Sequence, residues 1–196
     1  MANLLQACCL LRGKALVKLA WGGPDFTLSL IRRLGIDCDA RQNGTLRAAN
    51  HGKAVETLKQ TVDRWQRYGM DVSLLDAAAI AAATGTERYQ AAMLDPRGGD
   101  VNPLKFVRGL ADAASSAGAT IYGDSPARSL TSQNGGWVVE TPNGSLGARR
   151  VLMATNGYTD NLWPGLRSSA IPVFSAIAAT EPLSEKLVRQ IMPTRS

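Results

Sequence analysis

Two small polar side chains and a glycine, Thr155, Asn156 and Gly157, follow the apolar run 151–154. A short apolar run bounded by turn residues is typical of a strand buried on both faces of an α/β sheet. Ligands of such sheets bind outside the carboxyl ends of the strands, and a glycine lets them approach the backbone closely. We therefore expect residues 155–157 to face a ligand; the alternative is a strand that ends in an ordinary turn.

Three arginines could bind a substrate carboxylate through paired hydrogen bonds, namely Arg41, Arg47 and Arg97. The alternative for each of them is a solvated surface position. The single histidine, His51, precedes a predicted helix and is expected to be a surface or cap residue rather than a catalyst. Asp95 precedes a proline and is expected to be a turn residue. The sequence therefore indicates no catalytic triad.

A chain of 196 residues, with 45% hydrophobic and 19% charged residues, is long and apolar enough to fold around a core. The net charge of +6 comes from scattered basic residues without interleaved aromatic residues, which argues against a nucleic-acid interface. No apolar run approaches the ~18 residues of a membrane helix, so no membrane span is expected.

The three cysteines, Cys8, Cys9 and Cys38, lack Cys-x-x-Cys spacing. With one histidine they make no usual zinc set, so no metal is expected. Reduced thiols in a cytoplasmic protein are the simplest account. The apolar stretch 4–11 is as long as a signal-peptide core, but no Lys or Arg precedes it, and we expect that it is not a signal.

The elements of the first half are predicted from periodicity and turn residues. A helical pattern over 13–34 is interrupted at Gly22-Gly23-Pro24 and ends at Gly35, with Leu16, Leu19 and Ala20, then Leu28, Ile31 and Leu34, as its inner face. Asn43-Gly44 indicates a hairpin, and 45–48 a strand. A helix over 52–69 should bury Val55, Leu58, Val62 and Trp65. A short helix over 76–83, capped by Asp76, a strand over 89–94 and a turn over 95–99 complete this half.

In the second half, Asn102 and Pro103 are predicted to open a helix that Gly118 closes. Its buried stripe is expected to be Leu104, Val107, Leu110, Ala111 and Ala114. Strands are predicted over 119–122 and 151–154, with an antiparallel excursion between them that includes a strand over 137–141 and a turn over 142–144. A further strand is predicted over 173–180.

Four segments in this order resemble the FAD-dependent amine and amino-acid oxidoreductases of the D-amino-acid oxidase type, in particular the branch like gamma-glutamylputrescine oxidase. They are Cys38-Asp39-Ala40-Arg41 with Asn43-Gly44-Thr45-Leu46, Leu94-Asp95-Pro96 through Val101-Asn102-Pro103-Leu104, Ala154-Thr155-Asn156-Gly157-Tyr158 with Leu162-Trp163-Pro164, and Ala179-Thr180-Glu181-Pro182-Leu183. Each segment is weakly specific alone, whereas the ordered set over residues 13–185 is more specific.

The resemblance implies a mixed α/β fold, in which part of a Rossmann-like FAD-binding domain is interleaved with an antiparallel substrate domain. Residues 13–98 would belong to the substrate domain, 99–165 to the FAD-binding domain and 166–196 to the return into the substrate domain. By the same resemblance, Ser125, Pro126 and Ala127 would pass the adenine of FAD, and Thr155, Asn156 and Gly157 would lie beside the dinucleotide. The activity implied is oxidation of the C–N bond of a small-molecule amine or D-amino acid to an imine.

The chain also departs from that family. It contains no two glycines separated by a single residue, so the Gly-x-Gly-x-x-Gly turn that holds the pyrophosphate is absent. The amino-terminal strand-turn-helix and the carboxyl-terminal part of the family are missing, and residues 1–12 show no likeness to it. We therefore expect an internal fragment that is inactive and does not bind FAD alone, and that self-associates through an exposed sheet edge. The alternatives are a fragment of a nicotinamide-dependent dehydrogenase and a non-enzymatic remnant or interaction module.

Overall fold

The structure is a computed structural model that describes residues 10–169 and 171–193. The predictions about Cys8, Cys9 and residues 1–9 therefore lie outside the described residues. The chain divides into two compact units, one containing the residues up to Ala119 and from Glu181 onward, the other Thr120–Thr180. This boundary falls later than the predicted domain boundary after residue 98, and the division into 13–98, 99–165 and 166–196 stays a prediction.

The first unit begins with two helices, α2 (Leu10–Trp21) and α3 (Gly23–Leu34), which meet at the predicted break. The helix α3 ends at Gly35, as predicted, and this glycine adopts the left-handed conformation at φ 63°. The predicted inner face of α2 is wrong, because Leu19 is 75% exposed, whereas Val17 is buried and Trp21 packs against the core. Val17 and Trp21 are four residues apart and so share one side of the helix.

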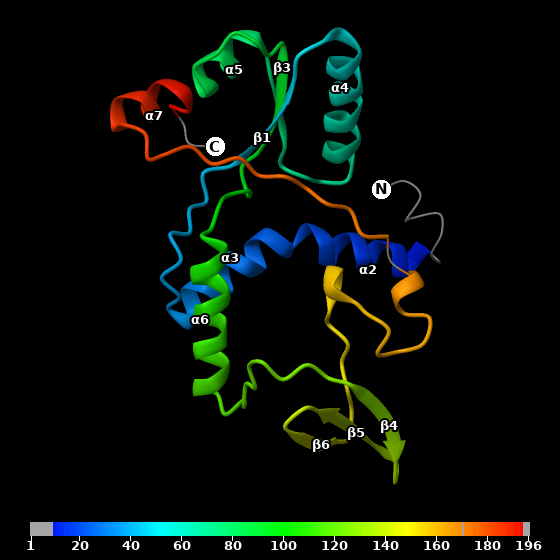
Figure 1. Ribbon diagram of the computed structural model, residues 1–196. Helices are drawn as coiled ribbons and strands as arrows, with labels where there is room; N and C mark the ends of the chain where they lie inside the picture. The colour runs from blue at the N-terminus through cyan, green and yellow to red at the C-terminus, as the bar shows by residue number, and fades with distance from the viewer. Residues whose placement is uncertain (1–9, 170, 194–196) are drawn as a thin grey trace. The chain divides into compact units, whose positions relative to one another are not determined.

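A three-stranded antiparallel sheet in the order β1-β3-β2 forms the centre of this unit (Figure 1). Its strands are β1 (Thr45–Ala49), β2 (Ser73–Leu75) and β3 (Ala91–Asp95). The strands predicted near 45–48 and 89–94 are confirmed, whereas β2 was not predicted. The predicted hairpin at Asn43-Gly44 is wrong, because no strand precedes these residues in the described part of the chain, and β1 pairs with β3. Gly44, at φ 89°, instead donates its backbone N–H to the Gly98 carbonyl at 3.0 Å.

Helices cover both faces of this sheet: α4 (Gly52–Arg67) lies on one side and α5 (Ala77–Thr84) on the other (Figure 1). The predicted stripe of α4 is confirmed, since Leu58 and Val62 are buried against Ala49, Ala91 and Met93, with Val55 and Trp65 packed alongside. Neighbouring strand residues alternate between faces. Ala92 accordingly belongs to the α5 side, where Ile80 is fully buried as well.

Both helices begin at the residues that the sequence indicates. The Nδ1 atom of His51 accepts the Ala54 backbone N–H at 3.3 Å, so this histidine caps α4, one of the two roles expected for it. The carboxylate of Asp76 accepts the Ala79 N–H at 2.8 Å and caps α5. A side-chain acceptor at this position satisfies an amide that the helix itself leaves without a partner.

The helix α6 (Pro103–Ser116) starts as predicted, with Asn102 accepting the Lys105 N–H at 3.2 Å. Its predicted buried stripe is wrong, because Leu104 and Val107 are 58% and 61% exposed. The side of α6 that packs is the one bearing Phe106, which contacts a second core of Leu28, Ile31 and Cys38.

The last helix of the first unit is α7 (Glu185–Ile191), which Ser184 caps by accepting the Leu187 backbone N–H. The end of α7 lies against Gly85, the left-handed residue that closes α5 at φ 71°. A Cβ atom on Gly85 would overlap the carbonyl oxygen of Gln190. The approach of α7 therefore requires a glycine at residue 85 for steric as well as conformational reasons.

The second unit contains a three-stranded meander, β4 (Ser129–Gln133), β5 (Gly136–Thr141) and β6 (Gly144–Ala148), in sequential antiparallel order. This is the antiparallel excursion that the sequence predicts, with the turn over 142–143 where expected. Trp137 of β5 packs edge-on against Trp163, with ring centroids 5.7 Å apart. Two short 3-10 helices, η1 (Asn156–Tyr158) and η2 (Arg167–Ser169), follow the meander.

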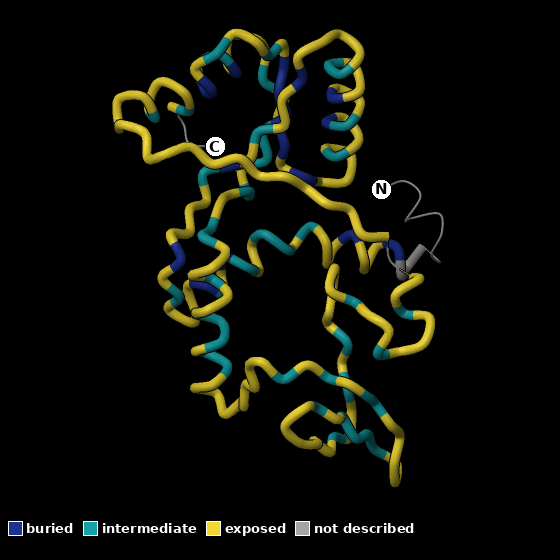
Figure 2. The backbone as a smooth tube through the Cα atoms, viewed as in Figure 1, coloured by how far each residue is buried: buried dark blue, intermediate teal, exposed yellow. Residues whose placement is uncertain are grey.

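Three predicted strands are wrong: residues 119–122, 151–154 and 173–180 have no strand structure. Leu152 is 88% exposed and Phe174 92%, and residues 171–184, which lead to α7, are all exposed (Figure 2). A buried strand needs hydrogen-bonded neighbours at its edges, and no described strand pairs with these segments. The predicted mixed α/β class with antiparallel sheets is confirmed. Within the described ranges, no helix is long and apolar enough to cross a bilayer.

Candidate functional site

The loop after β3 lies against the segment that leads into β1, and two glycines allow this contact. A Cβ atom on Gly98 would overlap the side chain of Thr45, and one on Gly99 would overlap the carbonyl oxygen of Arg41. Within this loop, Gly98 also accepts the Gly44 N–H. The consecutive glycines therefore bring the residues around positions 41–45 and 97–100 together at one end of the sheet.

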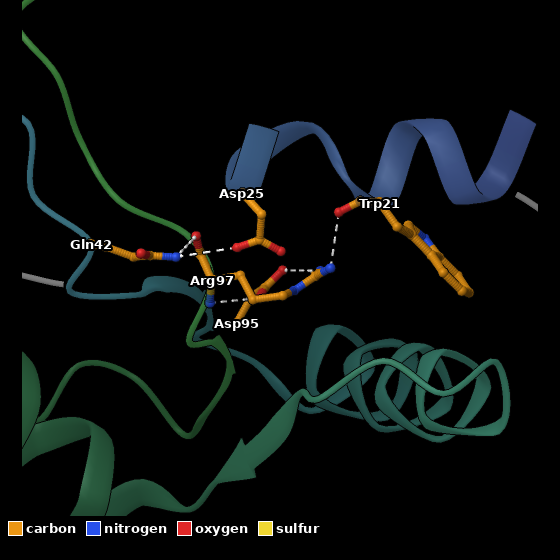
Figure 3. Close-up of polar contacts among 5 residues, drawn as sticks. All are labelled: Trp21, Asp25, Gln42, Asp95 and Arg97. Carbon is orange, nitrogen blue, oxygen red and sulfur yellow. Dashed lines mark hydrogen bonds and ion pairs between the residues drawn. The ribbon is translucent and has the colours of Figure 1, made fainter. Parts of the chain in front are cut away.

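Arg97, a predicted substrate ligand, is engaged in contacts within the protein (Figure 3). Its guanidinium donates to both carboxylate oxygens of Asp95, at 3.1 and 2.9 Å, and to the Trp21 carbonyl at 3.0 Å. The hydrogen bond and charge of Asp95 raise the pKa of Arg97. Gln42 adds a link between Asp25 and the Arg97 carbonyl. Arg97 thus joins the α2–α3 corner to the end of the sheet. Asp95, expected to be a turn residue, is instead the last residue of β3 and pairs with Thr45, and the turn follows it.

Arg41, a second predicted ligand, forms an ion pair with Asp100 at the same end of the sheet. Two backbone hydrogen bonds between these residues, of 2.9 and 3.0 Å, fix them side by side. The hydrogen bond that Arg41 donates to Asp100, and then the charge of Asp100, raise the pKa of Arg41. Both side chains remain half exposed, at 50% and 49%, so the pair can still meet a ligand.

A second ion pair, between Lys105 and Asp39, lies near the pair of Arg41 and Asp100. Lys105 at the start of α6 donates to Asp39 at 3.0 Å, and the side chain of Asn102 also contacts Asp39, at 3.5 Å. The hydrogen bond that Lys105 donates to Asp39 lowers the pKa of Asp39 and raises the pKa of Lys105. Lysine and aspartate therefore remain charged over a wider pH range than they would when separate.

Arg47, the third predicted ligand, is exposed on β1, opposite Met93 of β3. It lies on the strand that follows Arg41, but it takes no part in the described ion pairs. The structure therefore brings Arg41 and Arg97 to one end of the sheet, where each has an acidic partner, and leaves Arg47 on the edge strand.

The acidic partner of Arg41, Asp100, was not identified as a site residue from the sequence, and neither were Asp39 and Lys105. Asp100 and Arg41 are 59 positions apart, a separation that carries no local periodic signal. Pro96 and the consecutive glycines before Asp100 mark this loop in the sequence, and they indicate a turn without identifying its partner.

The residues matched to FAD lie in the second unit. Ser125, Pro126 and Ala127 lie in an extended segment before β4, where the Ser125 hydroxyl donates to the Gly123 carbonyl at 2.8 Å. Thr155, Asn156 and Gly157 lie in and beside η1, and Asn156 adopts the left-handed conformation at φ 45°. Their predicted place at the carboxyl end of a buried strand is wrong, because residues 151–154 form no strand.

These residues do not fit a complete FAD site. A dinucleotide pyrophosphate needs a glycine-rich turn from a strand into a helix, and the sequence has no Gly-x-Gly pair. Among the described residues, every paired strand is antiparallel. No hydrogen bond within the described ranges joins residues 125–127 to residues 155–157. The segments implied by the resemblance could contribute at most one part of a cofactor site.

The arrangement of helices and antiparallel sheets is that of the FAD-dependent amine and amino-acid oxidases. The crystal structure of glycine oxidase from Geobacillus kaustophilus matches with a TM-score of 0.70 and 26% identity, over 79% of this chain and 43% of that chain. L-proline dehydrogenase from P. horikoshii matches in fold with a TM-score of 0.61 at 18% identity, over 69% of this chain and 38% of that chain.

The sequence profile of the DAO family, FAD dependent oxidoreductase, matches residues 3–196, and the chain belongs to this family. The profile match begins at residue 3, within the segment 1–12, which by its motifs does not resemble the family. Gamma-glutamylputrescine oxidoreductase of Escherichia coli (strain K12) is 34% identical over 182 residues, which cover 92% of this chain and 42% of that protein. The chain thus spans less than half the length of this relative. FAD is the cofactor that family membership implies.

Proposed function

We propose that this chain is part of an FAD-dependent oxidoreductase that oxidises the C–N bond of a small-molecule amine or amino acid to an imine. The observation that carries the proposal is the 34% identity with gamma-glutamylputrescine oxidoreductase across 92% of the chain. Its support in the structure is the likeness to glycine oxidase. In enzymes of this kind the flavin supplies the redox chemistry, while the protein supplies binding, orientation and electrostatics.

We further propose that the chain alone neither holds FAD nor turns over substrate. The missing glycine-rich turn would remove several hydrogen bonds to charged oxygens, each worth roughly 1.5–3 kcal/mol. Titrating the purified chain with FAD, with flavin fluorescence and melting temperature as readouts, tests this directly. Neither readout should change, and a chain that keeps a visible flavin band through gel filtration would contradict the proposal.

The enzymatic assignment is tested in a chimera in which this chain replaces the matching region of the Escherichia coli relative. We expect the chimera to carry flavin and to oxidise an amine or amino acid, with the unmodified relative as the positive control. A folded chimera without flavin would favour a non-enzymatic remnant. A flavin-bearing chimera that oxidises neither amines nor amino acids would refute the proposed substrate class.

Two properties of the isolated chain belong to the same proposal. β1 and β2 are both edge strands of their sheet, so we propose that the chain self-associates by strand pairing. Light scattering that reports a monomer at all protein concentrations would contradict this. We also propose a cytoplasmic location, supported by the free, buried thiol of Cys38. Fractionation of the cells that produce the chain tests the location.

A further inference from the structure

Four asparagines are each followed directly by a glycine, at positions 43–44, 134–135, 143–144 and 156–157. Asparagine is one of the thermolabile residue types, and glycine has no side chain that would shield its own backbone nitrogen. In such a pair this nitrogen can attack the amide carbon of the asparagine side chain. Because the four pairs consist of the same two residues, the structure around each pair decides which of them reacts.

Asn43-Gly44 is the pair that the structure protects most. Gly44 is buried, and its backbone N–H donates to the Gly98 carbonyl at 3.0 Å. The next residue, Thr45, begins β1 and pairs with Asp95 of β3. The attacking nitrogen is therefore hydrogen-bonded inside the protein, and the segment would have to leave the sheet before it could react.

Two further pairs lie at the turns of the meander. Asn134 and Gly135 connect β4 to β5, and Gly144, which follows Asn143, is the first residue of β6 and pairs with Thr141. The attack requires the asparagine backbone to rotate out of its turn conformation. Paired strands on both sides of each turn oppose this rotation, so these two pairs are partly protected.

Asn156-Gly157 lies in η1, outside both sheets, and both residues are exposed. Within the described ranges, the Gly157 N–H has no hydrogen-bond acceptor. The turn is closed by two exposed hydrogen bonds, from the Tyr158 N–H at 2.9 Å and from the Thr159 N–H at 3.3 Å. Exposed backbone hydrogen bonds with few packed neighbours open at little cost in free energy. This pair therefore combines a free nitrogen with a backbone that can rotate.

We propose that Asn156 is a site of spontaneous deamidation in the folded protein. The Gly157 nitrogen forms a bond to Cγ of Asn156, the bond from Cγ to the side-chain nitrogen breaks, and ammonia leaves with the proton of the Gly157 amide. Water then opens the resulting ring. Opening at Cγ gives aspartate, and opening at the main-chain carbonyl carbon gives isoaspartate. One water is consumed and one ammonia is released, without an oxidant or a reductant.

The products differ from asparagine in charge and in the path of the backbone. Each of them adds one negative charge to a chain whose net charge is +6. The Asn156 carbonyl accepts the Thr159 N–H at 3.3 Å and the Thr159 hydroxyl at 2.7 Å. In isoaspartate the main chain continues through Cγ and this carbonyl becomes part of a free carboxylate, so η1 is no longer closed in the same way. The reaction is independent of the proposed function, because neither flavin nor substrate takes part.

Peptide mapping by mass spectrometry tests the proposal on the full chain, incubated at physiological temperature and mildly alkaline pH. Asn156 should be converted at least about tenfold faster than Asn43, because reaction at Asn43 first requires the buried hydrogen bond of Gly44 to open. Asn134 and Asn143 should also react more slowly than Asn156. Equal rates at Asn156 and Asn43, or a faster rate at either turn of the meander than at Asn156, would overturn the proposal.

The same incubation in concentrated urea shows whether the fold sets this order. In the unfolded chain the four pairs should react at similar rates, because no hydrogen bond or strand pair protects any of them. If Asn156 remained tenfold faster than Asn43 in urea, the flanking residues rather than the fold would determine the order, and the proposal would be refuted.

Gly157→Ala tests the attacking atom. A Cβ atom at this position would meet no other atom within 4 Å, and Gly157 is not in the left-handed region, so the variant should fold normally. The added methyl group shields the nitrogen, and conversion of Asn156 should become several-fold slower. The control is Gly123→Ala, which also adds a Cβ in open space but does not follow an asparagine, and it should leave the rate at Asn156 unchanged. An unchanged rate in Gly157→Ala would rule out the Gly157 nitrogen as the nucleophile.

Discussion

Replacing Gly85 by alanine tests how α7 is held on the first unit. Gly85 closes α5 in the left-handed conformation, at φ 71°, and the end of α7 lies directly against it. A suitable control is Gly35, which closes α3 at φ 63° and has open space where a Cβ would be placed. The two positions share a backbone conformation and differ in what surrounds them.

The expected sizes follow from that difference. Alanine in the left-handed region costs about 1–2 kcal/mol, so Gly35→Ala should destabilise the chain by that amount alone. At Gly85 the new Cβ would also overlap the Gln190 carbonyl, and backbone atoms cannot rotate away as a flexible side chain can. If α7 is displaced, the partly buried Val188 and Met192 lose their packing, which adds about 1–3 kcal/mol. Gly85→Ala should therefore destabilise by about 2–5 kcal/mol.

Urea unfolding measures the free energies, and limited trypsin digestion reports on α7 itself. Lys186 and Arg189 lie in this helix, and cleavage after them should become several-fold faster in Gly85→Ala but not in Gly35→Ala. Equal destabilisation in the two variants, with unchanged cleavage in α7, would show that α7 does not dock on Gly85.

Two further predictions concern the charged residues near the sheet. Arg97→Gln removes the ion pair that largely buried Asp95 depends on, and it should lower the free energy of unfolding by about 1–3 kcal/mol in urea titrations; a change within error would contradict this. Lys105 holds the pKa of Asp39 below 3.8, so this contact stabilises the fold at neutral pH and is lost as the pH falls through that lowered value. Lys105→Met should flatten this acid-side loss of stability in melting experiments, and unchanged pH dependence would refute the coupling.

The features that could be predicted from the sequence are those with local causes. His51, Asp76 and Asn102 cap helices because each acceptor lies next to the amides that it satisfies. The stripe of α4 recurs within a few turns, and the meander has its turns between neighbouring strands. In each case the relevant partners are close in sequence, so a short window contains the whole signal.

The features that could not be predicted depend on distant partners. The apolar run at 151–154 predicts a buried strand, but burial requires neighbouring strands, and none in the described part of the chain pairs with it. The apolar stripe of α6 likewise predicts burial, but Leu104 and Val107 are exposed. For the site, the paired hydrogen bonding of guanidinium groups makes Arg41, Arg47 and Arg97 candidates, but it does not identify the acidic partners of Arg41 and Arg97.

The two sheets also differ in when they can form during synthesis. Thr141 pairs with Gly144 and Gln133 with Gly136, so the meander can close as soon as its last strand has left the ribosome. Thr45, in contrast, pairs with Asp95. β1 can therefore pair with β3 only after α4, β2 and α5 have been synthesised. During that interval β1 has no native neighbour on either edge. Nascent chains that are synthesised on the same mRNA can therefore pair wrongly with one another at this strand.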